Sequence, residues 1–365
     1  MDVGYAAIFQ NPTTTRSDHE VYQRDLRLAE MAVQKLGFDS IWGVEHHFTD
    51  YTMCPDVTQF LSYCAGRCPT AQLGSMVIVL PWHDPMRVAE EIAMLDNMSD
   101  GRFILGMGRG LGRVEFEGFG VDQNDSREYF MEAADMIIKG LETGYCEYDG
   151  RLIKQARRDI RPRPFKSFKG RTYAAAVSPE SFEIMARLGA GVLVIPQKPW
   201  ETTVKELAAY RDFFQKQNGA PAPAPIIASW VFCDEDAGRA EAQARKYIGG
   251  YWGTVVKHYE MVGDHFSKLK GYETYREIQA RSSRPGGVDE MIEFFMSIQV
   301  WGTPQMCYDK IVNVLDKTHG GSFVGVFSYA GMPWDTAEHN LRLFSQQVLP
   351  ALKRLNKRPL LNLAA

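Results

Sequence analysis

The sequence lacks the features that mark membrane, secreted and nucleic-acid-binding proteins. No apolar run approaches the ~20 residues that span a bilayer, and the N-terminus has no basic stretch followed by an apolar one, as a secretory signal would. The net charge of −4 offers no basic excess for nucleic acid or an anionic membrane. Six cysteines in 365 residues are too few for a disulfide framework. We therefore expect a cytoplasmic protein that binds neither nucleic acid nor membranes.

Several common catalytic and cofactor-binding motifs are also missing. The glycines around Arg109 alternate, but the third glycine of a dinucleotide fingerprint is replaced by Leu111 or Arg113. There is no phosphate-binding Gly-Lys-Ser/Thr loop and no Gly-x-Ser-x-Gly nucleophile elbow. No His-Glu-x-x-His or paired Cys-x-x-Cys is present, so we expect no metal site.

What the chain does contain is a repeated alternation of short apolar runs and amphipathic segments. This alternation predicts a parallel sheet with helical crossovers. Eight units favour one (β/α)8 TIM barrel domain over residues 1–365, and a doubly wound open sheet is the second choice. The expected strands are residues 3–9, 40–44, 71–80, 103–108, 173–177, 191–195, 226–232 and 323–329.

Two stretches break the alternation and predict insertions after the fourth and seventh strands. Residues 149–171 are basic and contain prolines, which is more typical of a solvated loop than of a binding surface. Residues 263–287 have weak periodicity, mixed charges and several glycines. A long stretch of this kind in a compact domain is typical of a lid or a disordered segment.

Unusual residues follow four successive strands of the predicted barrel. Glu45-His46-His47 follows the second strand, Trp82 the third, Arg109 the fourth and Ser178 the fifth. The carboxyl ends of barrel strands form the active site in this fold, so these side chains should meet there. Arg109 among glycines can bind a phosphate, or it can be a surface arginine in a tight turn. Ser178 begins a helix, where backbone amides can bind phosphate or the serine can simply cap.

The two adjacent histidines should have different roles. On an extended backbone His46 and His47 point in opposite directions, so they cannot readily bind one metal together. One can face the pocket as a base or hydrogen-bond donor while the other is packed. Trp82, with nearby aromatic residues, either lines an apolar pocket or packs in the core.

Taken together, these residues resemble the bacterial luciferase-like flavin monooxygenases, especially the subunit that oxidises alkanals. The resemblance covers nearly the whole chain and rests on several separate motifs in matching order. They include Gly37-Phe38-Asp39, Glu45-His46-His47-Phe48-Thr49, Ile78-Val79-Leu80-Pro81, Gly101-Arg102-Phe103, Arg109-Gly110-Leu111, Asn124-x-Ser126-Arg127 and Gly302-Thr303-Pro304-Gln305.

The resemblance implies a (β/α)8 barrel with a flavin at its carboxyl end. It makes His46 the catalytic histidine, with His47 and Trp82 on the substrate side, and 263–287 the mobile lid. Met76 and Val77 match a segment beneath the flavin ring that often contains a cis peptide. The implied cofactor-binding residues are Met76, Val77, Gly108, Arg109, Leu111, Arg127, Ala176, Ser178 and Ser181.

The substrate side departs from the family pattern. Gly108 stands where luciferase has a reactive cysteine, Val177 replaces an acidic residue and Pro196 replaces a tryptophan. Met76 and Val77 are bulkier than the small residues of luciferase. The flavin site is kept while the substrate side is altered.

The resemblance implies a two-component monooxygenase that takes reduced FMN from a separate NAD(P)H:flavin reductase. Reduced FMN and O2 would form a C4a-hydroperoxide, which oxygenates a hydrophobic aldehyde, ketone or ring compound. The chain would pair with a second copy or a related chain. The alternatives are an F420-dependent oxidoreductase on the same fold and a non-catalytic flavin-binding subunit.

Overall fold

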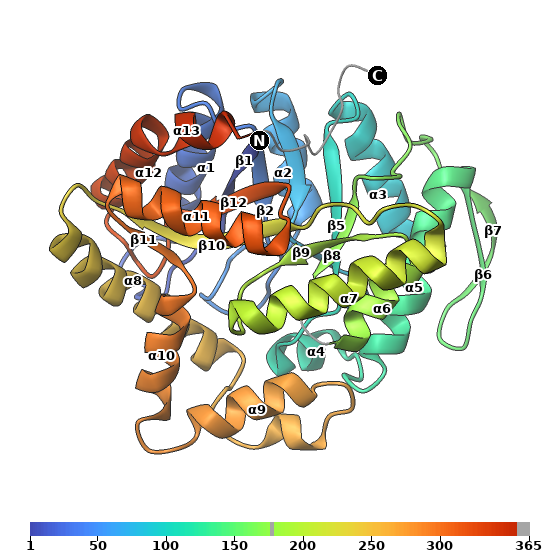
Figure 1. The fold of residues 1–365 in the computed structure, drawn as a ribbon. Helices are drawn as coiled ribbons and strands as arrows, with labels where there is room; N and C mark the ends of the chain where they lie inside the picture. Colours follow the sequence, from blue (N-terminus) through green and yellow to red (C-terminus); the bar gives the residue numbers. More distant parts are fainter. Residues whose placement is uncertain (176–178, 356–365) are drawn as a thin grey trace.

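The computed structural model of the chain describes residues 1–175 and 179–355. Within that part of the chain, eight parallel strands close into a barrel, as the sequence predicts (Figure 1). Ring closure runs through β10, which pairs with β9 on one side and β12 on the other. The barrel strands are β1 (Asp2–Ala7), β2 (Ser40–Gly43), β3 (Gln72–Ser75), β5 (Phe103–Gly108), β8 (Thr172–Ala175), β9 (Gly191–Val194), β10 (Ile226–Cys233) and β12 (Ser322–Val326).

Helices cover the outside of the barrel, and their starts follow the local sequence. Ser17 caps the first helix through a capping box with Glu20, and Asp84 caps the third by accepting from the backbone N–H of Arg87. The helices of the alternating units are α1 (Asp18–Gln34), α2 (Val57–Arg67), α3 (Pro85–Met98), α5 (Ser126–Thr143), α6 (Pro179–Arg187), α7 (Trp200–Asn218), α8 (Ala237–His258), α11 (Pro304–Thr318) and α12 (Trp334–Gln347). None of the helices in the described part of the chain combines the length and apolar character needed to cross a bilayer.

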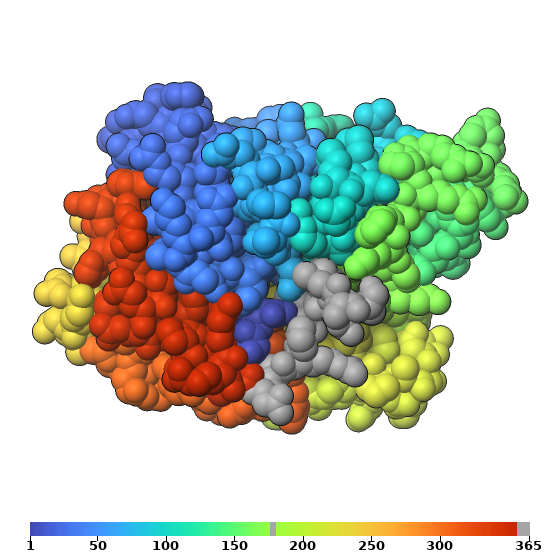
Figure 2. Space-filling view, turned by 90° about the horizontal axis from the view of Figure 1, so that it is seen from above, coloured from blue at the N-terminus to red at the C-terminus, as the bar shows by residue number. Residues whose placement is uncertain are grey.

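Figure 1 places the carboxyl ends of the strands at the bottom of the view. The short helix α4 (Arg113–Phe119) lies there, together with α9 (Glu273–Ser282) and part of α10 (Gly287–Ser297). Figure 2 shows the opposite end from above, where the first helices adjoin the last ones, among them α13 (Leu349–Lys353). The amino group of Met1 donates to the carbonyl of Lys353 at this end.

The third predicted strand, residues 71–80, is in fact two strands. β3 ends at Ser75, and β4 (Ile78–Val79) pairs only with β5, while a 3-10 turn (Leu80–Trp82) follows. The peptide bond between Met76 and Val77 is cis, in agreement with the resemblance.

The insertion after the fourth barrel strand is a β-hairpin rather than the loop expected for residues 149–171. Strands β6 (Tyr145–Asp149) and β7 (Lys154–Asp159) pair antiparallel and project from the side of the barrel in both views (Figures 1 and 2). The buried carboxylate of Glu132 on α5 fixes the turn by accepting from three successive backbone N–H groups, those of residues 151–153, at 2.7–3.0 Å. The composition of residues 149–171 gives no sign of this contact, because Glu132 lies outside that segment.

The insertion after the seventh barrel strand contains regular structure. A 3-10 turn (His265–Lys268) and α9 lie within residues 263–287. A further short strand, β11 (Val300–Gly302), pairs parallel with the last three residues of β10 and has no counterpart among the expected strands.

Candidate functional site

A cavity of about 170 Å³ opens at the carboxyl end of the barrel, where the sequence places the site. Most of the predicted site residues line it. These are His46, Met76, Val77, Trp82, Gly108, Arg109, Leu111, Arg127 and Ser181. His47 does not line this cavity, and Ala176 and Ser178 lie outside the described residues.

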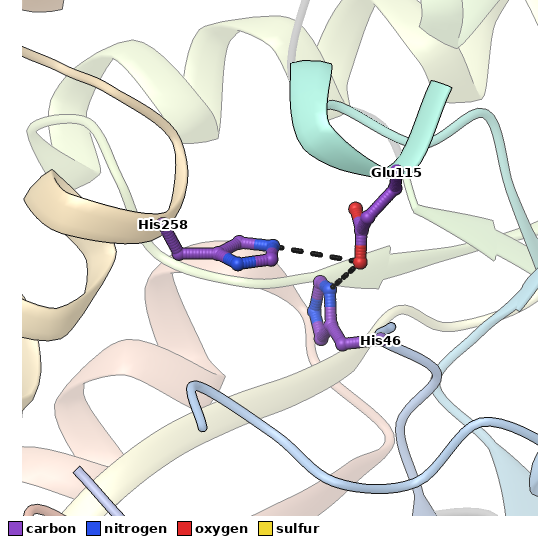
Figure 3. Close-up of side chains that lie close together, drawn as sticks. All are labelled: His46, Glu115 and His258. Carbon is purple, nitrogen blue, oxygen red and sulfur yellow. Dashed lines mark hydrogen bonds and ion pairs between the residues drawn. The ribbon is translucent and has the colours of Figure 1, made fainter. Parts of the chain in front are cut away.

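His46 belongs to a cluster with Glu115 and His258 (Figure 3). It follows β2, Glu115 lies in the first turn of α4, and His258 ends α8. The Nδ1 of His46 lies 2.9 Å from Oε1 of Glu115, and Nε2 of His258 lies 3.5 Å from the same oxygen. Figure 3 shows both imidazole rings directed at this one carboxylate.

The hydrogen bonds of this cluster define which nitrogen of His46 carries a proton. An ionised carboxylate only accepts, so Nδ1 of His46 donates to Glu115. The backbone N–H of His47 donates to the same oxygen at 3.0 Å. When the ring is neutral, its Nε2 is therefore an acceptor, and the hydroxyl of Tyr259 lies 3.3 Å away from it. His46 thus presents a basic nitrogen beside the cavity.

The electrostatics of the cluster favour an ionised Glu115. Burial alone would raise the pKa of this carboxyl, but the neighbouring His46 and His258 outweigh burial and lower the pKa to about 2. Burial lowers the pKa of His258, against the opposing effect of Glu115. Nδ1 of His258 makes a 2.8 Å hydrogen bond with the hydroxyl of Thr49. The arrangement orients His46 through a fixed negative charge.

The same three residues form a group with the spacing of metal ligands. One ligand atom from each lies within 4.8 Å of the others. Sequence spacing could not reveal this group because its members come from three separate elements. A metal here would have to replace the hydrogen bond from His46 to Glu115, and that bond already accounts for the geometry of both side chains.

A second buried carboxylate, Glu45, organises the neighbouring wall. Its Oε1 accepts from Nε2 of His83 at 2.6 Å and of His47 at 3.1 Å. Its Oε2 accepts from the backbone N–H of Val79 at 2.8 Å. Burial would lower the pKa of His83, but Glu45 outweighs it and raises the pKa. Glu45 therefore ties the loop after β2 to the segment that follows the cis peptide.

The bulky Val77 and the small Gly108 are complementary. A Cβ atom built on Gly108 would lie 2.2 Å from Cγ2 of Val77, which no real contact allows. Val77 therefore occupies the space that a side chain at 108 would need, on the wall of the cavity.

Two arginines converge at the outer end of the cavity. One Nη2 from each of Arg109 and Arg127 donates to the carbonyl of Gly271, at 2.9 and 3.1 Å. The guanidinium of Arg109 also stacks over the ring of Tyr272, 4.0 Å from its centroid. Its Nη1 is buried without a hydrogen-bond partner among the described residues. Ser181, in the first turn of α6, lines the same cavity.

Residues of the second insertion cover this end of the cavity. Gly271, Tyr272 and Tyr275 all belong to its lining. The hydroxyl of Tyr272 lies 3.0 Å from Oγ of Ser126. The insertion therefore lies where the resemblance places a lid.

Sequence reasoning did not single out Glu115, His258 or Tyr259. Glu115 is an ordinary acidic residue in a first helical turn, and His258 lies at the end of a long helix. The only available signal was position, because His258 and Tyr259 immediately precede the predicted lid.

Comparisons with known proteins agree with the fold. Residues 1–318 match the luciferase-like monooxygenase family. The alkanal monooxygenase alpha chain of Photorhabdus laumondii is 27% identical over 346 residues, covering 92% of this chain and 94% of its own. The FMN-bound oxygenating constituent of 3,6-diketocamphane monooxygenase from Pseudomonas putida has a TM-score of 0.74 at 17% identity, covering 96% of this chain and 98% of its own. The coenzyme F420-dependent tetrahydromethanopterin reductase of Methanopyrus kandleri has a TM-score of 0.66 at 20% identity, covering 96% of this chain and 99% of its own. The chain belongs to the luciferase-like monooxygenase family.

Proposed function

We propose that this protein is the oxygenating component of a two-component, FMN-dependent monooxygenase. A separate NAD(P)H:flavin reductase would supply reduced FMN, and the substrate would be a hydrophobic aldehyde, ketone or ring compound. The observation that carries the proposal is one cavity with two arginines at its outer end and the Nε2 of His46 farther in. The 27% identity to an alkanal monooxygenase supports the same reaction class.

The residues at the outer end fit the phosphate of FMN. A buried arginine nitrogen without a partner is costly, and a phosphate oxygen is the acceptor that an arginine binds best. Arg109 and Arg127 would hold the phosphate, with Ser181 at the helix start beside them. Met76 and Val77 would lie beneath the flavin ring. Bound reduced FMN would supply two electrons to O2, so that one oxygen atom enters the substrate and the other leaves as water.

The chain's own residues would control protons and water. Nε2 of His46 would accept or return a proton at the reacting centre, while Glu115 holds the ring in position. Tyr272 and Tyr275 on the insertion would exclude water. The apolar floor formed by Met76 and Val77 would serve the same purpose.

The alternative on this fold is an F420-dependent oxidoreductase, which transfers hydride without oxygen. The likeness to the F420-dependent reductase favours this candidate, since a deazaflavin also carries a phosphate for the two arginines. Titration with FMN and with F420 separates the two functions, because the monooxygenase must bind FMN more tightly.

The test is stopped-flow absorbance after mixing anaerobic protein and reduced FMN with oxygenated buffer. We expect a transient spectrum, distinct from those of reduced and oxidised FMN, that persists longer than with free FMN. His46→Ala should shorten its lifetime, whereas the matched control His19→Ala, at an exposed position, should not. Immediate formation of oxidised FMN by the native protein would contradict the proposal.

A further inference from the structure

A second cavity of about 100 Å³ adjoins the first on the inner side of His46. The two cavities share part of their lining and are therefore adjacent. The shared residues are His46, Met76, Ile195, Gln197 and Tyr259. The second cavity is therefore placed to hold a reactant beside the proposed flavin site.

Aromatic side chains form the walls of this second cavity. The ring of Trp230 on β10 lies 4.3 Å from that of Tyr251 and 5.4 Å from that of Phe295, centroid to centroid. Trp252 lies 4.9 Å from Phe295. Flat rings pack well against such walls because offset and edge-to-face contacts are both available. The described residues that line it include no aspartate, glutamate, lysine or arginine.

Two hydrogen-bond donors in these walls have no acceptor. The indole N–H groups of Trp230 and Trp252 are buried, and neither has a partner among the described residues. The exposed fractions of the two side chains are 7% and 3%. Buried indole N–H groups normally find a partner. By contrast, the hydroxyls of Tyr51 and Tyr251 share a hydrogen bond of 2.5 Å, in which one donates to the other.

We propose that this cavity binds a neutral, single-ring aromatic compound with a carbonyl group, whose oxygen accepts from an indole N–H once the ring of Trp230 or Trp252 turns, because both indole nitrogens are buried in the structure. This inference rests on the proposed function, because it assigns the ring compound to a place beside the flavin. Apolar cavities of about 150 Å³ hold a benzene ring. This cavity, at about 100 Å³, is smaller, so a bound ring would extend past His46 into the adjoining cavity.

The test compares three probes in binding titrations with the resting protein, with and without oxidised FMN. Acetophenone carries the ring and the carbonyl, ethylbenzene lacks the carbonyl, and heptan-2-one lacks the ring. We expect acetophenone to bind about tenfold more tightly than ethylbenzene, the equivalent of one hydrogen bond of about 1.4 kcal/mol. Heptan-2-one should bind most weakly.

Variants identify the donors. The double variant W230F/W252F keeps the aromatic walls and removes both N–H groups, so it should bind acetophenone and ethylbenzene equally well. In the single variants Trp230→Phe and Trp252→Phe, the ratio of acetophenone to ethylbenzene affinity should lie between those of the double variant and the native protein. The single variants replace the double variant in the test if it does not fold. Trp334→Phe, on α12 and outside this cavity, is the matched control and should keep the native ratio.

An unchanged ratio in W230F/W252F and in both single variants, equal binding of heptan-2-one, or no binding of acetophenone would overturn the proposal. These titrations need neither O2 nor a reductase. Failure of the monooxygenase test with successful titrations would therefore reject the proposed function and leave the aromatic site standing.

Discussion

At the scale of single residues, Glu115 makes the hydrogen bonds that hold His46 in the site. Its Oε1 holds both the ring of His46 and the backbone N–H of His47. Its Oε2 has no hydrogen-bond partner among the described residues. A fully buried carboxylate of this kind is retained for the orientation and charge it provides rather than for stability. In the proposed function, Glu115 would act through His46, as a positioning residue.

Replacing Glu115 with glutamine should lower turnover while preserving the fold. The amide keeps the size of the side chain but removes the charge, and it can present its N–H₂ group to His46 instead of an acceptor. We expect kcat to fall by about 10- to 100-fold, the size of loss that follows when a group orienting a metal-bound histidine is replaced. Steady-state rates across pH, with thermal melting as the folding check, measure this effect.

The matched control is Glu117→Gln, at an exposed position of the same helix. It should retain native rates at every pH. A Glu115→Gln enzyme with a native rate and pH profile would show that the carboxylate does not position His46.

At the scale of elements, Asp25 joins three parts of the barrel at one buried point. It lies on α1 and accepts from the backbone N–H of Phe9, after β1, and from the hydroxyl of Ser328, after β12. Burial is the main influence on this carboxyl and raises its pKa to about 7. The folded protein therefore holds a proton on Asp25 that the unfolded chain releases at lower pH.

This proton makes stability depend on pH in a defined direction. The pKa of Asp25 is raised in the folded state, so its favourable contribution is complete below the ordinary value of 3.8 and is lost as pH rises toward about 7. The loss has an upper bound of about 4 kcal/mol. Asp25→Asn should remove this loss and melt at a higher temperature than the native protein at pH 8, with a smaller difference at pH 5.

Thermal melting at the two pH values measures the effect. Asp159→Asn makes the same chemical change on the exposed strand β7 and should show no such pH-dependent gain. If the advantage of Asp25→Asn were equal at both pH values, the buried proton would not exist.

Periodicity and the positions of glycine and proline predict the barrel from the sequence, because each strand and helix carries its own local signal. The hairpin of β6 and β7 lacks such a signal, since its turn depends on Glu132 from another element. The residues of the site also fall into those with a local sequence signal and those without one. His46 and Arg109 follow strands and are predictable, whereas Glu115 and His258 reach His46 only through folding of distant segments.

At the scale of the whole molecule, α2 and α3 lie side by side and expose apolar side chains. Tyr63 is 43% exposed, and Met94 and Met98 are each 48% exposed. Exposed apolar groups on two adjoining helices are available to a protein interface. With the resemblance to a family whose members pair, they lead us to expect a dimer with a second copy of the chain through these helices.

The double variant M94K/M98K should convert this dimer to a monomer at micromolar concentration, because two lysines on each copy would be buried against each other. Light scattering after size-exclusion chromatography measures the mass. Met306→Lys, on α11 and 37% exposed, should leave the dimer intact. A native protein that elutes as a monomer would contradict the expectation.

The carbonyl of Gly271 has a consequence for the kinetics of cofactor uptake. It accepts from one donor of each guanidinium, those of Arg109 and Arg127. In the proposed function, a phosphate that used these two donors would have to displace the carbonyl, and only molecules with the segment lifted could bind it in this way. The association rate would then depend on that fraction of molecules, and the apparent affinity would be weaker by the same factor. Weak retention of this kind would suit a protein that receives its cofactor from a separate reductase in every cycle.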